Sequence, residues 1–161
     1  MAYKRTACEE AAYYLGPRKR TEREVRDHLK DKGYSDEEIA QAAAYLKEGR
    51  YIDDYDYALC YAEISYGKGR ASKRIISELE QKGIDGETAR MALEDYRYEN
   101  SIDERELAVR QAGKLMESER IESEEDYRKV RGRLARRLDS RGFSASDIMA
   151  ALDALMMEEW D

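Results

Sequence analysis

The sequence predicts an all-α fold of three tandem three-helix repeats that form an elongated, curved array. Apolar residues recur at helical spacing along almost the whole chain, and no segment alternates with period two for long enough to form a strand. Capping hydroxyls and acids recur just before these segments. One glycine-centred pattern also appears three times, which indicates a repeated architecture.

Paired capping residues mark most of the predicted helix starts. The side-chain oxygen at the cap accepts a hydrogen bond from an unpaired amide of the first turn, and the acid three residues later favours the positive end of the helix dipole. The pairs are Thr21 with Glu24, Ser35 with Glu38, Asp53 with Asp56, Ser101 with Glu104, Ser123 with Asp126, and Ser144 with Asp147. We predict helices near residues 3–15, 22–32, 36–48, 54–66, 72–82, 86–98, 103–118, 124–140 and 145–158.

The internal repeat is centred on Gly33, Gly83 and Gly142. Each glycine follows a basic residue and precedes a bulky apolar one, and apolar or aromatic residues recur at fixed offsets on both sides. These offsets describe two amphipathic helices joined by a glycine whose left-handed conformation closes the first helix. The predicted core positions are Val25, Ile75, Leu134, Leu29, Leu79, Leu138, Ile39, Ala89, Ile148, Ala43, Leu93, Leu152, Leu46, Tyr96 and Leu155.

A further helix precedes each pair, so the predicted repeats are residues 1–50, 51–100 and 101–161. Tandem helical units bury their apolar faces mainly against their neighbours, which favours an extended array. We therefore expect a radius of gyration above the roughly 15 Å of a compact domain of this length.

Composition narrows the class of protein. Charged residues make up 40% of the 161, the mean hydropathy is -0.91, and no uncharged stretch approaches the roughly 20 residues of a spanning helix. The start of the chain has no apolar signal core, so we expect a cytoplasmic protein. The net charge of -7 argues against tight binding to bare nucleic acid, which depends on neutralising phosphates.

Candidate catalytic and metal-binding residues have simpler explanations. Cys8 and Cys60 form no cluster with the single histidine, His28, and are expected to be small helical core residues. Asp53 and the acids after it are expected to cap a helix rather than bind a metal. Gly67 and its neighbours fit no phosphate-binding loop, because no strand precedes them. We predict no enzyme, no cofactor and no metal.

The tyrosines are candidates for either core packing or base stacking. The repeat pattern favours core packing for Tyr34, Tyr45 and Tyr96. Both roles, or a place on a partner surface, stay open for Tyr13, Tyr14, Tyr55, Tyr61 and Tyr66.

The chain resembles the RecX regulatory proteins, bacterial modulators of the RecA recombinase, over about residues 3–157. The resemblance depends on the order and spacing of several short motifs. These are Lys32-Gly33-Tyr34-Ser35, Tyr51-Ile52-Asp53-Asp54 with Tyr57-Ala58, Arg74-Ile75 with Glu78-Leu79 and Lys82-Gly83-Ile84, and Arg141-Gly142-Phe143-Ser144 with Ile148.

The resemblance implies three tandem three-helix repeats that lie in the groove of the RecA filament on single-stranded DNA. It implies lower ATP hydrolysis, strand exchange and co-protease activity of RecA, and so a role in recombination, DNA repair and the SOS response. It implies contact with single-stranded DNA weakly or only through the filament. From the sequence we expect no membrane association and a monomer. The tyrosine-rich stretch 51–66 and the acidity of the chain depart from the usual family pattern.

Positive charge is concentrated in the middle helix of each predicted repeat. Lys and Arg outnumber Asp and Glu by seven to four in 18–32, by five to two in 68–82 and by seven to one in 128–141. The functional interpretation is a row of basic helices facing an acidic partner surface or its phosphates. The candidate partner-binding residues are Arg18, Lys19, Arg20, Arg23, Lys68, Arg70, Lys73, Arg74, Arg128, Lys129, Arg133, Arg136, Arg137 and Arg141.

Two other interpretations stay open at this point. The basic residues could be a solvated face with internal salt bridges, which is common on helices. The glycine-joined pairs could also act as helix-turn-helix modules that bind DNA directly, with 36–48, 86–98 and 145–158 as reading helices. The acidic residues on those helices count against direct DNA binding.

Overall fold

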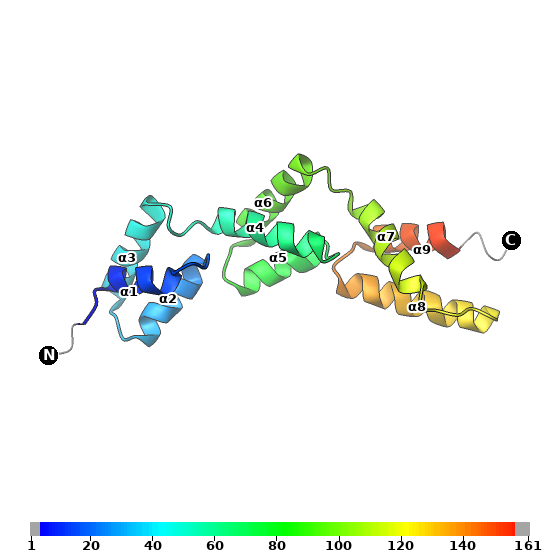
Figure 1. Ribbon diagram of the computed structural model, residues 1–161, viewed down its shortest axis with the longest axis horizontal. Helices are drawn as coiled ribbons and strands as arrows, with labels where there is room; N and C mark the ends of the chain where they lie inside the picture. The colour runs from blue at the N-terminus through cyan, green and yellow to red at the C-terminus, as the bar shows by residue number, and fades with distance from the viewer. Residues whose placement is uncertain (1–3, 157–161) are drawn as a thin grey trace. The chain divides into compact units, whose positions relative to one another are not determined.

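The computed structural model describes residues 4–156, and the remaining residues, 1–3 and 157–161, lie outside that description. The described part is all helical and contains no strand, which confirms the predicted fold class (Figure 1). In chain order the helices are α1 (Ala7–Leu15), α2 (Glu22–Asp31), α3 (Asp36–Glu48), α4 (Asp54–Gly67), α5 (Ser72–Gln81), α6 (Gly86–Glu99), α7 (Glu104–Met116), α8 (Glu124–Ser140) and α9 (Ala145–Met156).

Helix boundaries follow the prediction closely, and α1 differs most. It begins at Ala7 because Thr6 and Glu9 form a capping box: the Glu9 amide donates to Thr6 Oγ1 over 3.2 Å, and the Thr6 amide donates to the Glu9 carboxylate over 2.8 Å. At its far end α7 stops at Met116 rather than at 118. The predicted positions 3 and 157–158 lie outside the described residues.

Five of the six predicted capping pairs are confirmed. In each, the acid's backbone amide donates to the side-chain oxygen of the predicted cap, at 3.0–3.2 Å. The confirmed caps are Thr21, Ser35, Asp53, Ser123 and Ser144. Asp85 holds the same position before α6 and accepts hydrogen bonds from the Glu87 and Thr88 amides.

The prediction that Ser101 caps a helix with Glu104 is wrong. Ser101 has φ +51°, and Asp103 caps α7 by accepting from the amides of Arg105 and Glu106. Glu104 is buried, and its carboxylate accepts hydrogen bonds from Tyr66 Oη (2.8 Å) and the Ser72 amide (2.9 Å). The acid therefore caps α5, a helix far away in the sequence.

The three repeat glycines close their helices in the same way. Gly33, Gly83 and Gly142 have φ values of +83°, +91° and +92°. The next amide in each case donates to the carbonyl five residues earlier, which is the bond typical of a glycine-terminated helix. The pairs, donor first, are Tyr34 to Leu29 (3.2 Å), Ile84 to Leu79 (3.1 Å) and Phe143 to Leu138 (3.3 Å).

The predicted core positions are buried, with few exceptions. All six on the first helices of the pairs have no exposed surface: Val25, Leu29, Ile75, Leu79, Leu134 and Leu138. On the second helices, Tyr96 and Leu155 are half-buried. The core prediction for Tyr45 is wrong because its side chain is 62% exposed. Tyr45 lies one position before the buried Leu46, which turns it away from the apolar stripe of α3.

Two compact units divide the described residues, and each contains one junction between successive helix pairs. The first comprises the described residues up to Tyr61 together with Glu78–Ala92. In it, Thr21 Oγ1 donates to the Lys82 carbonyl over 2.8 Å, and the Arg23 guanidinium donates to the Gln81 carbonyl over 2.7 Å. The start of α2 therefore contacts the glycine turn after α5.

The second unit comprises Ala62–Ser77 and the described residues from Leu93 onward. Here the start of α5 contacts the glycine turn after α8. The Ala71 amide donates to the Arg141 carbonyl over 2.8 Å, and the Arg74 guanidinium donates to the Ser140 carbonyl over 3.0 Å. The two units thus repeat one junction with different side chains.

Candidate functional site

A basic cleft of about 430 Å³ lies within the second unit, where the end of α4 and the start of α5 meet the end of α8. Its lining contains five cationic side chains and no carboxylate. The lining residues are Lys68, Arg70, Arg74, Leu115, Arg137, Ser140 and Arg141. All five cations are among the candidate partner-binding residues, so the fold brings together charges that are up to 73 positions apart.

Backbone geometry positions the cleft. After α4 ends, Gly69 takes φ +72°, and the Arg70 amide donates to the Ser65 carbonyl over 3.0 Å, which turns the chain into α5. The Arg141 guanidinium donates to the Lys68 carbonyl over 3.2 Å. Together with the Arg74 bond to the Ser140 carbonyl, this contact fixes the two walls of the cleft against each other.

Three cations of the cleft, Lys68, Arg137 and Arg141, are placed to meet an external anion. The Arg141 guanidinium donates to a neutral carbonyl, which orients it without cancelling its charge. Lys68 and Arg137 are exposed, and Arg137 lies in the last turn of α8. Several cations in one concave site favour an anion with more than one charge.

The corresponding positions in the first unit carry mixed charge. Aligned through the repeat glycines, Arg74 corresponds to Glu24 and Arg137 corresponds to Glu78. Glu24 accepts from the Thr21 amide over 2.9 Å, and Glu78 accepts from Tyr61 Oη over 2.7 Å. The all-cationic lining is therefore a property of the second unit.

The other candidates of the first unit have local partners or face solvent. Lys19 Nζ is paired with Asp56 and lies 3.2 Å from Cys60 Sγ. The Arg20 guanidinium lies 4.3 Å from the centre of the Tyr14 ring, and Arg18 is exposed. Arg23 is bonded to the Gln81 carbonyl, so each of these cations either has a local contact or faces solvent.

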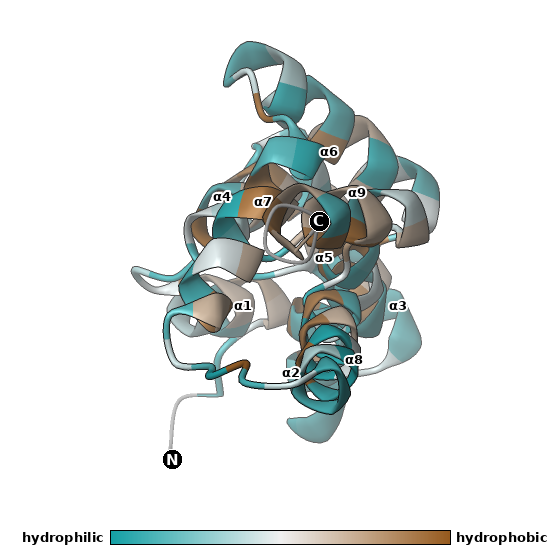
Figure 2. Cartoon of the chain, turned by 90° about the vertical axis from the view of Figure 1, so that its right-hand side faces the viewer, coloured by the Kyte–Doolittle hydropathy of each residue, from teal (hydrophilic) through white to brown (hydrophobic). Residues whose placement is uncertain are grey.

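The basic face of α8 is partly neutralised, although many residues of this helix are hydrophilic (Figure 2). Arg128 and Lys129 pair with acids four residues earlier on the helix. Arg133 binds Glu119 through two nitrogens, which holds the pKa of the Glu119 carboxyl below its ordinary value. Lys73 pairs with Asp139 over 3.5 Å. Arg136 is exposed and makes no ion pair with a described residue.

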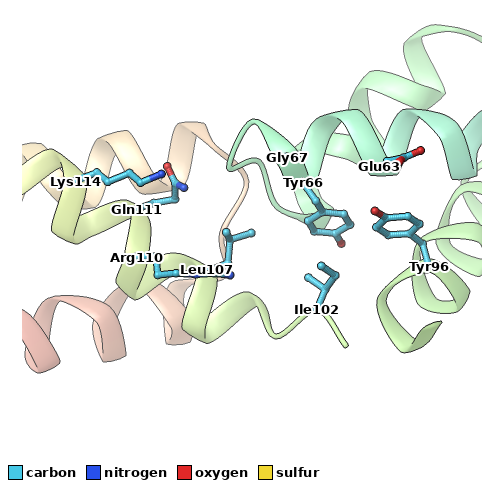
Figure 3. Close-up of a pocket in the computed structure, with 9 residues that line it drawn as sticks. All are labelled: Glu63, Tyr66, Gly67, Tyr96, Ile102, Leu107, Arg110, Gln111 and Lys114. Atoms are coloured by element: carbon cyan, nitrogen blue, oxygen red, sulfur yellow. The ribbon is translucent and has the colours of Figure 1, made fainter. Parts of the chain in front are cut away.

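A second recess, of about 350 Å³, lies next to the cleft (Figure 3). The rings of Tyr66 and Tyr96 stack in it with centroids 5.8 Å apart, and Ile102 and Leu107 supply apolar surface. Its polar residues are Glu63, Arg110, Gln111 and Lys114. The sequence analysis missed Arg110 and Lys114, because they lie outside the basic middle helices.

Other sequence features have structural roles. His28 stacks on Tyr14 with centroids 3.8 Å apart, and its Nε2 lies 2.9 Å from the Glu10 carboxylate. Cys8 packs against the first hydrophobic core, Cys60 is half-buried, and both are free thiols. In residues 4–156 no group of three or more histidines, cysteines or acids has the arrangement of a metal site. No described helix is both long enough and apolar enough to cross a bilayer.

Comparisons of the sequence with a family model and with known proteins all match this chain to RecX proteins. Residues 7–46 match the family described as "RecX, first three-helix domain". "Regulatory protein RecX" of Bacillus licheniformis is 34% identical over 155 residues, which is 95% of this chain and 56% of the relative. The protein of the same name from Bacillus subtilis is 32% identical over 146 residues, or 90% of this chain and 53% of the relative.

Two solved structures share the fold. The crystal structure of RecX from Lactobacillus salivarius has a TM-score of 0.80 and 27% identity, and the match covers 94% of this chain and 95% of that one. A crystal structure of regulatory protein RecX has a TM-score of 0.75 and 26% identity, covering 95% of this chain and 72% of that one. This chain spans little more than half the length of the curated relatives that it matches.

Proposed function

Because this chain is a member of the RecX family, we propose that it regulates the RecA recombinase by binding the RecA filament on single-stranded DNA. In this proposal it lowers the ATPase, strand-exchange and co-protease activities of the filament and so modulates recombination and DNA repair in the cytoplasm. The observation that carries the proposal is the match to RecX proteins over at least 90% of this chain.

The mechanism needs no chemistry by this chain itself. A monomer built from the three repeats 1–50, 51–100 and 101–161 can contact more than one recombinase subunit, which would slow turnover by holding the filament in one state. The basic cleft and the exposed Arg136 and Arg137 near the end of α8 are the proposed contact surface, because cationic side chains gather there and no acid lines the cleft.

Direct DNA reading by helix-turn-helix modules is less well supported. In that docking the first turn of the second helix contacts bases in the groove. The first turn of α3 consists of Asp36, Glu37 and Glu38, and the first turns of α6 and α9 each carry an acidic residue and no basic one. These negative side chains would be repelled by the negative phosphates of DNA.

Reversing the charges of Arg136 and Arg137 together tests the contact surface. Both side chains are exposed, so Arg136→Glu with Arg137→Glu should weaken filament binding at least about tenfold without loss of helical content. The matched control reverses Arg128 and Lys129, which are already paired on the same helix, and should have a smaller effect. No weakening would assign this face to solvent, and equal weakening by both variants would mean that overall charge, not a contact by Arg136 and Arg137, changes the binding.

A further inference from the structure

The basic cleft and the tyrosine recess share one wall. Gly67 lines the recess, whereas Lys68 and Arg70, the residues that follow it in the same loop, line the cleft. Between the two, the Gln111 side chain packs directly on Gly69: a Cβ there would lie 2.4 Å from its Cδ. The same loop therefore borders both spaces, and Figure 3 shows the residues that line the recess, Gly67 and Gln111 among them.

The α7 helix borders both spaces as well. Lys114 lines the recess and the next residue, Leu115, lines the cleft. Consecutive helical residues are separated by only 1.5 Å of rise, so the two spaces border the same turn of α7.

The chemistry of the cleft suits phosphate groups. Guanidinium and ammonium groups recognise phosphate oxygens through charge-assisted hydrogen bonds, and Arg presents a planar fork of donors. A single carboxylate would leave most of the charge of Lys68, Arg137 and Arg141 uncompensated. Linked phosphates match the several cations of the lining better.

The chemistry of the recess suits a nucleobase. Stacked aromatic rings and apolar side chains provide a surface for a planar heterocycle, and stacking of this kind tolerates different bases. Burial raises the pKa of the Tyr66 hydroxyl, which stays protonated and donates to Glu104, so the ring is held in a fixed position. The Gln111 amide, which lines the recess, offers both a donor and an acceptor to the edge of a base.

We propose that the cleft and the recess together form a nucleotide-binding site, with the phosphates against Lys68, Arg137 and Arg141 and the base in the recess beside Tyr96. The site differs from a glycine-rich phosphate loop because side-chain cations, not backbone amides, hold the phosphates. The ligand is either a free nucleoside di- or triphosphate or one nucleotide of a single strand. This inference does not depend on the proposed regulation of a recombinase.

Calorimetric titration of the whole chain tests the site without any recombinase. The probes are ATP, inorganic tripolyphosphate, a short oligothymidylate and a polyglutamate peptide. We expect ATP or the oligothymidylate to bind more tightly than tripolyphosphate, and the peptide to bind more weakly than all three. Preference for ATP identifies the free nucleotide as the source of the phosphates, and preference for the oligothymidylate identifies the single strand.

Matched variants locate the binding. Lys68→Ala with Arg137→Ala should weaken ATP and oligothymidylate binding at least about tenfold, since each removes a charge-assisted contact. Arg128→Ala with Lys129→Ala removes the same charge from residues that already pair with acids on α8, so it should change affinity less than about twofold. Circular dichroism checks that both variants keep their helical content.

The recess has its own variant. Tyr96→Leu keeps an apolar side chain but removes the ring, so it should weaken ATP or oligothymidylate binding several-fold and leave tripolyphosphate binding unchanged. The proposal is overturned if no phosphate probe binds, if the two cation variants weaken binding equally, if polyglutamate binds as tightly as the nucleotides, or if Tyr96→Leu affects tripolyphosphate and nucleotide alike.

Discussion

Acids at the starts of α4 and α7 bind the first amides of other helices, and they are half-buried or buried. The Glu104 carboxylate accepts from Tyr66 and from the first amide of α5, and Asp54 accepts from the Glu22 amide, the first of α2, over 2.9 Å. Burial raises the pKa of the Asp54 carboxyl above its ordinary value. Each acid satisfies an amide that the helix itself leaves unpaired. A substitution at these positions therefore affects two helices at once.

Removing Glu104 should destabilise the second unit. Glu104→Ala leaves the Tyr66 hydroxyl and the Ser72 amide without their acceptor, so the free energy of unfolding should fall by about 2–4 kcal/mol. Glu104→Gln keeps one acceptor oxygen and should cost less. Urea unfolding followed by circular dichroism measures both, with the exposed Glu106→Ala as control. An alanine variant as stable as this control would contradict the assigned role.

This residue also shows where reasoning from the sequence alone fails. The Ser101 and Glu104 spacing fits a local capping pair, as do five other pairs that the structure confirms. Local spacing gives no information about Tyr66 and Ser72, which lie more than thirty positions away. The Tyr66 hydroxyl and the Ser72 amide donate hydrogen bonds to the Glu104 carboxylate instead. The error comes from a tertiary contact that competes with a local one.

At the scale of elements, the glycine turn serves both to end a helix and to dock on the preceding pair. At Gly142 an added Cβ would lie 2.4 Å from the Arg74 amide nitrogen, whereas at Gly33 it would meet nothing within 4 Å. At Gly83 an added Cβ would meet the side chain of Arg23, which is flexible and can move aside more easily than backbone can. One local motif therefore has three different surroundings.

Alanine substitutions at Gly33 and Gly142 should distinguish the cost of backbone strain from the cost of disrupting the contact between the turn and the neighbouring helix. Gly33→Ala carries only the strain of a left-handed conformation and should cost about 1 kcal/mol. Gly142→Ala adds a backbone clash and should cost about 3 kcal/mol or more. Thermal or urea unfolding measures the difference. Equal losses at both positions would mean that the turn does not dock as described.

The repeat was predictable at this scale, but the cleft was not. The offsets around the three glycines depend only on helical periodicity, so the sequence contains them directly. The cleft depends on which residue of α8 meets the loop after α4, and periodicity does not specify that contact. Charge counts therefore found all five cations of the cleft without showing that Arg128 and Lys129 pair with acids on their own helix instead of joining the cleft.

At the scale of the whole molecule, an acidic chain concentrates positive charge at one place. The net charge is -7, yet the cleft of the second unit is lined by five cations, and its equivalent in the first unit includes Glu24 and Glu78. Overall acidity disfavours indiscriminate binding to polyanions, while a local basic site permits selective binding. This combination fits a protein that recognises an assembled filament better than naked DNA.

The most direct measurement is ATP hydrolysis by the cognate RecA recombinase on preformed single-strand filaments, with this protein titrated in. Binding to bare single strand is measured alongside at the same salt concentration, because salt alone changes such affinities by orders of magnitude. The account predicts inhibition at fewer than one protein per recombinase, without comparable binding to the naked strand. Unchanged hydrolysis even at an excess of this protein would contradict it.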